Sequence, residues 1–328
     1  MRERRVSPAG RASMLRVASM LAPLLPSCFA AYPLHESATL HNDQGIERLA
    51  AGDLEGAAAA FRLALEYNNR FSEPYNNLAL VEIRRGNLDE AEALLRRALL
   101  LNEDFAEAWT NLGYVRLRRG DAAEAVAAFE ESIAIDPGQL DARYNLILAL
   151  SELGELDEAW EQVLRLDVAT PDDPAAQGLA AWIASRLGRH DEALGWATRA
   201  LAADPAQPLA NLAAGVTLLE RGAADEAEPY LRAAEAGDLG PAASLSLGLA
   251  LLRLGRWTES RAAFAAALEA CPDLLPALVG AGTAAAGEGD LAAAREWLSR
   301  ALEQDAVRGG LDAPTRAAAE ELLASLGE

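Results

Sequence analysis

The sequence predicts an all-α solenoid of antiparallel helix pairs, and three observations lead to this prediction. Glycine recurs along most of the chain at intervals of 34 residues, with a single interval of 33. Ala, Leu, Glu and Arg, which all favour helix, dominate the composition. A period of 34 residues has room for two helices of about 13–15 residues each and two tight turns.

The glycine column sets the frame of the repeat. Its members are Gly52, Gly86, Gly120, Gly154, Gly188, Gly222, Gly255 and Gly289. Each is expected just beyond a first helix, where a left-handed cap requires a residue without a side chain. The second helix then begins, and four repeats close with a proline that stops it: Pro137, Pro171, Pro205 and Pro272.

Two further columns predict how the helices of a pair meet. Seven residues before each glycine stand Gly45, Ala79, Gly113, Ile147, Ala181, Gly215, Gly248 and Gly282. Nine residues after it stand Phe61, Leu95, Phe129, Val163, Ala197, Leu231, Phe264 and Leu298. Glycine inside a helix costs about 1 kcal/mol relative to alanine. Its recurrence in the first column therefore predicts a compensating close contact between the paired helices.

These columns resemble the tetratricopeptide repeat, most clearly where Trp109, Leu112 and Gly113 are followed by Ala125, Phe129 and Pro137. The resemblance implies an all-α, right-handed superhelical solenoid with eight repeats over residues 38–308. Residues 309–328 are expected to form a C-terminal capping helix, because solenoid ends need a cover. The repeats are 38–71, 72–105, 106–139, 140–173, 174–207, 208–240, 241–274 and 275–308.

The charged residues exclude several classes of function. The formal net charge is −21, which disfavours binding to nucleic acids, and all 29 basic residues are arginine. Without lysine there is no Schiff-base or phosphate-loop lysine. Three histidines are too few for a histidine metal site or an evident catalytic triad. The repeats occupy the chain from residue 38, so we expect no enzyme, no catalytic residues, no cofactor and no metal.

Residues 1–37 are interpreted as a signal-like segment and linker. Five arginines in residues 1–16 precede the uncharged stretch 17–31, which is a secretory pattern and is too short to span a bilayer. Residues 25–28 resemble a bacterial lipoprotein box, which makes Cys28 a candidate for lipidation and membrane anchoring; Pro26 departs from that box. The alternatives are ordinary cleavage before Ala31 and a disordered cytosolic tail.

The family resemblance implies a concave groove, lined by first helices, that holds an extended peptide or a single helix. Asn77, Asn111 and Asn145 recur there every 34 residues, with Asp43 at the matching place in repeat one. A carboxamide can pair with both groups of a peptide bond. The column resembles the asparagine ladder in the repeats of O-linked N-acetylglucosamine transferases. The alternative is that these asparagines bridge neighbouring repeats.

Two more columns supply candidate contacts. Arg84, Arg118, Arg186 and Arg253 stand near the ends of first helices. They would hold a partner's carboxylate or, alternatively, interact with the negative C-terminal end of the helix dipole. Tyr114 and Trp182 belong to an inward-facing column together with Ile46, Leu80, Leu148, Val216 and Leu249. Contact with a partner and packing in the core are both possible roles for these residues.

These features predict a non-catalytic scaffold that binds a protein or peptide partner in the bacterial cell envelope, periplasmic or lipid-anchored. The implied roles are assembly of pili, secretion machines or outer-membrane complexes. The alternative is a cytoplasmic adaptor or co-chaperone-like regulator. The chaperone-binding members of the family hold a terminal carboxylate with a clamp that contains lysine, and this lysine-free chain departs from that pattern.

Overall fold

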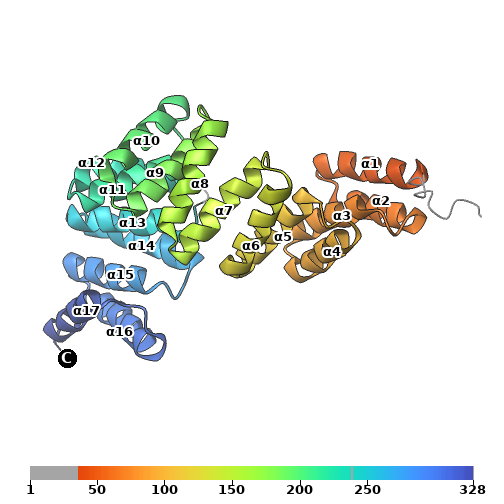
Figure 1. Cartoon of the computed structure of the whole chain (residues 1–328). Helices are drawn as coiled ribbons and strands as arrows, with labels where there is room; N and C mark the ends of the chain where they lie inside the picture. The colour runs from red at the N-terminus through yellow and green to blue at the C-terminus, as the bar shows by residue number, and fades with distance from the viewer. Residues whose placement is uncertain (1–35, 238, 328) are drawn as a thin grey trace, which may run out of the picture. The chain divides into compact units, whose positions relative to one another are not determined.

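The computed structural model describes residues 36–237 and 239–327, and all regular structure in these residues is helical (Figure 1). Cys28 and the remainder of the signal-like segment through residue 35 lie outside the described residues. The chain divides into two compact parts, the first ending at Glu103 and the second beginning at Asp104. Each part is described by itself.

The N-terminal part contains two helix pairs. The first pair packs through a core that includes Phe61 and Ala57, and Leu78 and Val81 of the second pair join the same core. The helices are α1 (Glu36–Ala50), α2 (Leu54–Tyr67), α3 (Ser72–Arg85) and α4 (Leu88–Leu101).

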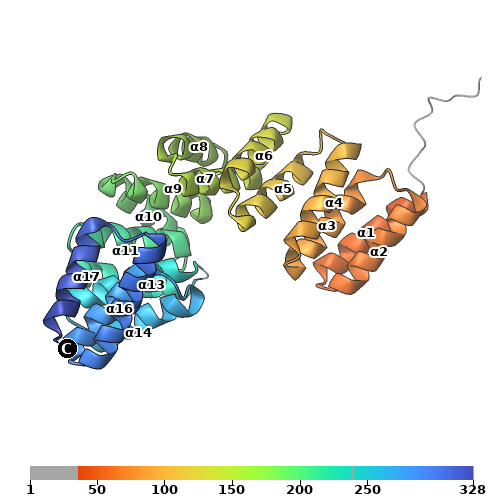
Figure 2. The ribbon, with the colours of Figure 1, turned by 90° about the horizontal axis from the view of Figure 1, so that it is seen from below.

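The C-terminal part contains six helix pairs followed by one further helix (Figure 2). Each first helix packs against the second helix of its own pair, and each second helix packs against the next helix in the chain. The helices are α5 (Ala106–Arg119), α6 (Ala122–Ile135), α7 (Leu140–Leu153), α8 (Leu156–Ala169), α9 (Pro174–Arg186), α10 (His190–Ala203), α11 (Pro208–Glu220), α12 (Ala224–Glu235), α13 (Pro241–Arg253), α14 (Trp257–Ala270), α15 (Leu275–Glu288), α16 (Leu291–Arg308) and α17 (Ala313–Ser325).

The glycine column forms the predicted left-handed caps. All eight column glycines have positive φ, between 69° and 86°. At Gly86, for example, the amide donates to the carbonyls of Glu82 and Ile83 and so satisfies the end of α3. A side chain at this φ would be strained, so the cap requires glycine and ends each first helix at the same register.

The predicted contact between paired helices is also present. A Cβ atom at Gly45 would lie 2.4 Å from Phe61, and one at Gly113 would lie 2.6 Å from Phe129. Both phenylalanines are fully buried. The glycines inside the first helices therefore leave space for the large residue of the second helix. The two helices come closer than an alanine would allow.

A set of closing bonds that the sequence did not reveal joins four of the repeats to the one before. The residue four places into several repeats donates a side-chain hydrogen bond to the carbonyl six residues earlier. In three repeats that carbonyl belongs to the closing proline, which explains why a buried polar residue recurs there. The pairs are Tyr75 with Asn69, Arg143 with Pro137, Gln177 with Pro171, and Asn211 with Pro205.

Helix α17 is fastened to the last repeat. The carboxylate of Asp305, in the last turn of α16, accepts from the amide of Leu311 at 2.9 Å and from the guanidinium of Arg316. The hydrogen bond from Arg316 lowers the pKa of Asp305 below its usual range. Ala319 is buried against the preceding repeat. This helix therefore caps the C-terminal end of the solenoid.

We expect Gly248→Ala to lower the free energy of unfolding by about 1–2 kcal/mol, although alanine is the better helix former. The new methyl group would lie 2.7 Å from Phe264, whose ring is also held by Gly280. Gly195→Ala is the matched control, because a Cβ there meets nothing within 4 Å. It should raise stability by up to about 1 kcal/mol. Urea unfolding compares the two, and equal stabilisation would contradict the close-contact role.

Candidate protein-interaction site

The candidate binding residues all lie on first helices. In the N-terminal part, Asn77 and Arg84 are on α3. In the C-terminal part, the candidates are Asn111, Tyr114 and Arg118 on α5, Asn145 on α7 and Trp182 on α9. We call the side of the first helices that carries these residues the first-helix face. Their structural surroundings divide them into residues used within the solenoid and residues that remain partly exposed.

Asn77 is used within the N-terminal part. Its Nδ2 donates to Oδ1 of Asn42 on α1 at 2.9 Å, and Asn42 is 6% exposed. The bond joins repeat two to repeat one. Sequence reasoning had matched Asn77 with Asp43 and missed Asn42, the neighbouring residue, because column spacing does not reveal which side chain faces the next helix. This geometry favours the bridging interpretation for Asn77.

The other two asparagines are half-buried on their helices. Nδ2 of Asn145 donates to the carbonyl of Asp141 one turn earlier in α7, at 2.9 Å. Such a local bond leaves the carboxamide oxygen available and is weak enough to exchange for a partner. Asn111 occupies the same register on α5. The column thus does not act as one uniform set, since Asn77 and Asn145 have different partners.

The arginine column links successive repeats. Nη1 of Arg84 donates to the carbonyl of Leu49 at 3.0 Å, and Nη1 of Arg186 donates to the carbonyl of Ser151 at 3.1 Å. Arg253 makes the same bond to the carbonyl of Leu219. Each acceptor lies in the last turn of the preceding first helix. Each of these carbonyls also accepts from the amide of the column glycine three residues later, so the guanidinium group is a second donor at the negative end of the helix dipole.

Arg118 and Tyr114 are brought together by the structure. Nη1 of Arg118 donates to the Tyr114 hydroxyl at 3.0 Å, and its guanidinium lies 5.8 Å from the ring centroid. Arg118 is exposed and Tyr114 is half-buried. The pair presents an aromatic edge beside a positive charge, which suits contact with a peptide that carries a carboxylate.

Trp182 has a mixed role. It is half-buried and contacts three core clusters, which places most of its ring in the packing between repeats. Arg186 lies 6.0 Å from its ring centroid. The same position on neighbouring helices carries Leu148, Val216 and Leu249, and Leu249 is 37% exposed. The C-terminal part therefore offers a row of partly exposed apolar residues on successive first helices.

Tyr144 lies one turn before Leu148 on α7 and packs against the same core cluster as Leu148. Burial, and then the carboxylate of Asp173, raise the pKa of Tyr144 above its usual value. The phenol therefore stays neutral under physiological conditions and can donate a hydrogen bond.

The described residues contain no cluster of three or more His, Cys, Asp or Glu side chains that could hold a metal ion. None of the helices in the described part of the chain is both long and apolar enough to cross a membrane.

Profiles of the tetratricopeptide repeat match most of the described chain. One matches residues 42–99, 76–139 and 209–274, and two others match residues 116–183 and 275–300. The chain belongs to the tetratricopeptide-repeat family, with eight repeats and a C-terminal capping helix, and it is a protein-interaction scaffold of that family. No curated protein matches its sequence.

Two solved structures with TM-scores above 0.6 agree with this fold. A tetratricopeptide-repeat protein from Parabacteroides merdae is 14% identical, with a TM-score of 0.63 over 76% of this chain and 99% of that one. A chain of the Cut9–Hcn1 heterotetramer of the APC/C is 16% identical, with a TM-score of 0.67 over 91% of this chain and 57% of that one. YrrB, described as having an unusual peptide-binding site, is 26% identical, with a TM-score of 0.48 over 60% of this chain and 98% of that one.

The two asparagines should respond differently to substitution. Asn77→Ala leaves the buried Asn42 without its partner, so we expect a loss of about 1–2 kcal/mol in the stability of the N-terminal part. Asn145→Ala removes only a local bond and improves helix propensity, so stability should change by less than about 0.5 kcal/mol. Hydrogen exchange of α1, α3 and α7 amides measures both effects. Equal changes would contradict the bridging role of Asn77.

Proposed function

We propose that the chain is a non-catalytic scaffold that holds an extended peptide or a helix along the first-helix face of its C-terminal part. The observation that carries this proposal is the row of partly exposed apolar residues at one position of successive first helices: Leu148, Trp182, Val216 and Leu249. The candidate residues of the N-terminal part carry it less well, because Asn77 and Arg84 already bond to α1.

The spacing of this row suits a helical partner. Packed helices lie about 8–10 Å apart, and every seventh residue of a partner helix advances by about 10.5 Å along its axis. An amphipathic helix could therefore place one apolar residue against each repeat. The Tyr114–Arg118 pair and the carboxamide of Asn145 would supply polar contacts at the same face.

A cross-linked pull-down from the native host tests this role. Val216→Ser with Leu249→Ser should weaken partner capture at least about tenfold, because two apolar contacts are lost. Leu164→Ser with Val168→Ser is the matched control, since both side chains are exposed on the second helix α8. The Asn77, Asn111 and Asn145 triple alanine variant reports separately on the asparagine column. Circular dichroism must first show equal helix content.

If the control pair and the Val216/Leu249 pair reduce capture equally, the first-helix face is not the binding surface. If the triple asparagine variant alone loses the partner, the asparagine ladder rather than the apolar row holds the peptide.

We also propose that the scaffold works in the bacterial cell envelope, where it would support assembly of pili, secretion machines or outer-membrane complexes. The support is the arginine-rich start followed by the uncharged residues 17–31. Lipidation of Cys28 would anchor the chain to a membrane, although one acyl chain gives only marginal binding and further chains would be needed for stable attachment.

Fractionation of the native host with mass spectrometry of the N-terminus tests the location. We expect a mature chain that begins at Cys28, carries lipid and sediments with membranes, and Cys28→Ser should release it or block its processing. A lipid-free start at Ala31 in the periplasm would replace anchoring by ordinary secretion. An intact N-terminus in the cytosol would instead support the adaptor role.

A further inference from the structure

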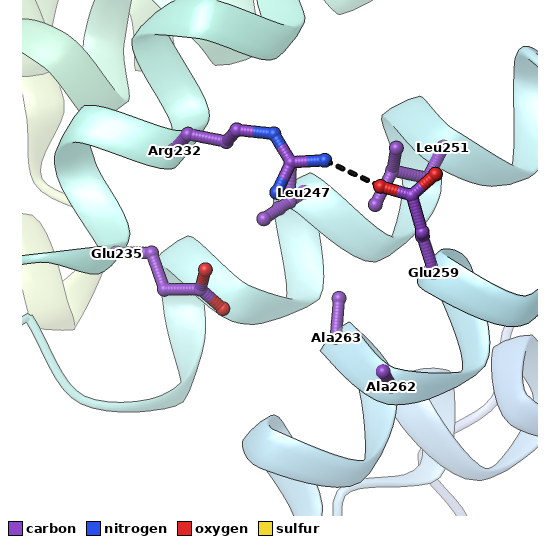
Figure 3. Close-up of a pocket in the computed structure, with 7 residues that line it drawn as sticks. All are labelled: Arg232, Glu235, Leu247, Leu251, Glu259, Ala262 and Ala263. Carbon is purple, nitrogen blue, oxygen red and sulfur yellow. Dashed lines mark hydrogen bonds and ion pairs between the residues drawn. The ribbon is translucent and has the colours of Figure 1, made fainter. Parts of the chain in front are cut away.

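A small pocket opens in the C-terminal part, between the second helices of two successive repeats and the first helix that lies between them in the chain. It has a volume of about 230 Å³ and lies between α12, α13 and α14 (Figure 3). Leu247 and Leu251 of α13 form its floor, and Ala262 and Ala263 of α14 form one wall. Arg232 and Glu235 of α12 and Glu259 of α14 stand at its rim.

The pocket coincides with an irregularity in the repeat. Helix α12 has 12 residues and ends at Glu235, whereas α10 and α14 have 14 residues each. Pro229 lies inside α12. Residues of the last turn of this shorter helix line the pocket together with the small side chains of Ala262 and Ala263.

Most charges near the pocket cancel within one ion-pair network. Arg232 bonds to Glu228 and Glu259, each at 2.8 Å. Arg256 bonds to the same two carboxylates at 2.6 and 2.5 Å. Hydrogen bonds from Arg232 lower the pKa of Glu228, and those from Arg256 lower the pKa of Glu259. Both acids therefore remain ionised and balance the two guanidinium groups.

Glu235 is the charge that remains. Its Oε1 accepts a hydrogen bond from the Ser244 hydroxyl at 3.0 Å, and it forms no ion pair with any described residue. In Figure 3 its carboxylate extends toward the alanine wall, on the other side of the pocket from the Arg232–Glu259 pair. The pocket thus combines one negative charge without an ion-pair partner, at its rim, with an apolar wall and floor.

We propose that this pocket receives a lysine side chain from a partner protein. The aliphatic stem would lie along Ala262 and Ala263, and the ammonium would bind the carboxylate of Glu235. Lysine fits better than arginine because Ser244 already occupies one oxygen of Glu235, and a guanidinium fork pairs best with two free carboxylate oxygens.

The composition narrows the source of that lysine. This chain contains no lysine at all, so a second copy cannot supply one. The occupant therefore belongs to a different protein, and the net charge of −21 would attract a basic one. Helix α13 also carries Leu249 of the apolar row, but no residue that lines the pocket belongs to that row, so the two proposed contacts use different side chains.

A titration of the full chain with n-pentylammonium, which copies a lysine side chain, tests the proposal. Methyl NMR signals of Leu247, Leu251, Ala262 and Ala263 should shift in a saturable way. n-Pentanoate, which has the same number of carbon atoms but a negative charge, should leave these chemical shifts unchanged. If pentanoate moves the same methyl signals as strongly, or if pentylammonium moves signals across the whole surface, the pocket does not recognise a cation.

Variants then separate the two components of the site. Glu235→Gln keeps an acceptor for Ser244 but removes the charge, and should weaken pentylammonium binding about threefold or more. Glu226→Gln, on the same helix but outside the pocket, should leave binding unchanged. Ala262→Leu should block the pocket, and circular dichroism checks that it folds. Equal effects of Glu235→Gln and Glu226→Gln, or normal binding by Ala262→Leu, would overturn the assignment.

Discussion

The solenoid depends on one contact inside each helix pair, between the large residue of the second helix and the small residue it faces on the first. Residue sizes at the two positions are complementary in most repeats; in the fifth, Ala181 and Ala197 are both small. Gly45 faces Phe61, and where the first helix carries a bulkier residue, Ile147, the second carries Val163. Because cores are close-packed, a large residue on one helix requires a small residue on the other. The contact recurs at the same register of each repeat, and this register places the exposed residues of successive first helices at matching positions.

The same regularity determines what the sequence could predict. Helix ends, glycine caps and the close contact of Gly113 with Phe129 follow from spacing within one repeat, and all are found. The bond between Asn77 and Asn42 joins residues 35 positions apart in neighbouring repeats, where the direction of each side chain decides the partner. Column spacing carries no such information. The pocket beside Glu235 was missed because it results from a departure from the repeat.

The two kinds of helix present different chemistry. First helices in the C-terminal part expose apolar and aromatic side chains at a constant interval, which suits a partner with its own periodic pattern. Second helices carry ion pairs such as Arg232 with Glu259, and α12 and α14 contribute to the irregular pocket beside Glu235. A regular surface recognises a partner by the length and the residue pattern of that partner, whereas an irregular pocket recognises one side chain at one place. A scaffold with both could fix the register of a long partner or hold two proteins at once.

The arginine bonds between repeats have a mechanical consequence. Arg84, Arg186 and Arg253 each tie a repeat to the end of the preceding first helix, while Glu152 and Glu220 occupy this column in repeats four and six. In a stack where each repeat contacts only its neighbours, stiffness is set interface by interface. The interfaces of repeats four and six therefore rely on other bonds, such as the one from Thr217 to Ser185, and a pulling force along the chain would load different kinds of contact at different interfaces.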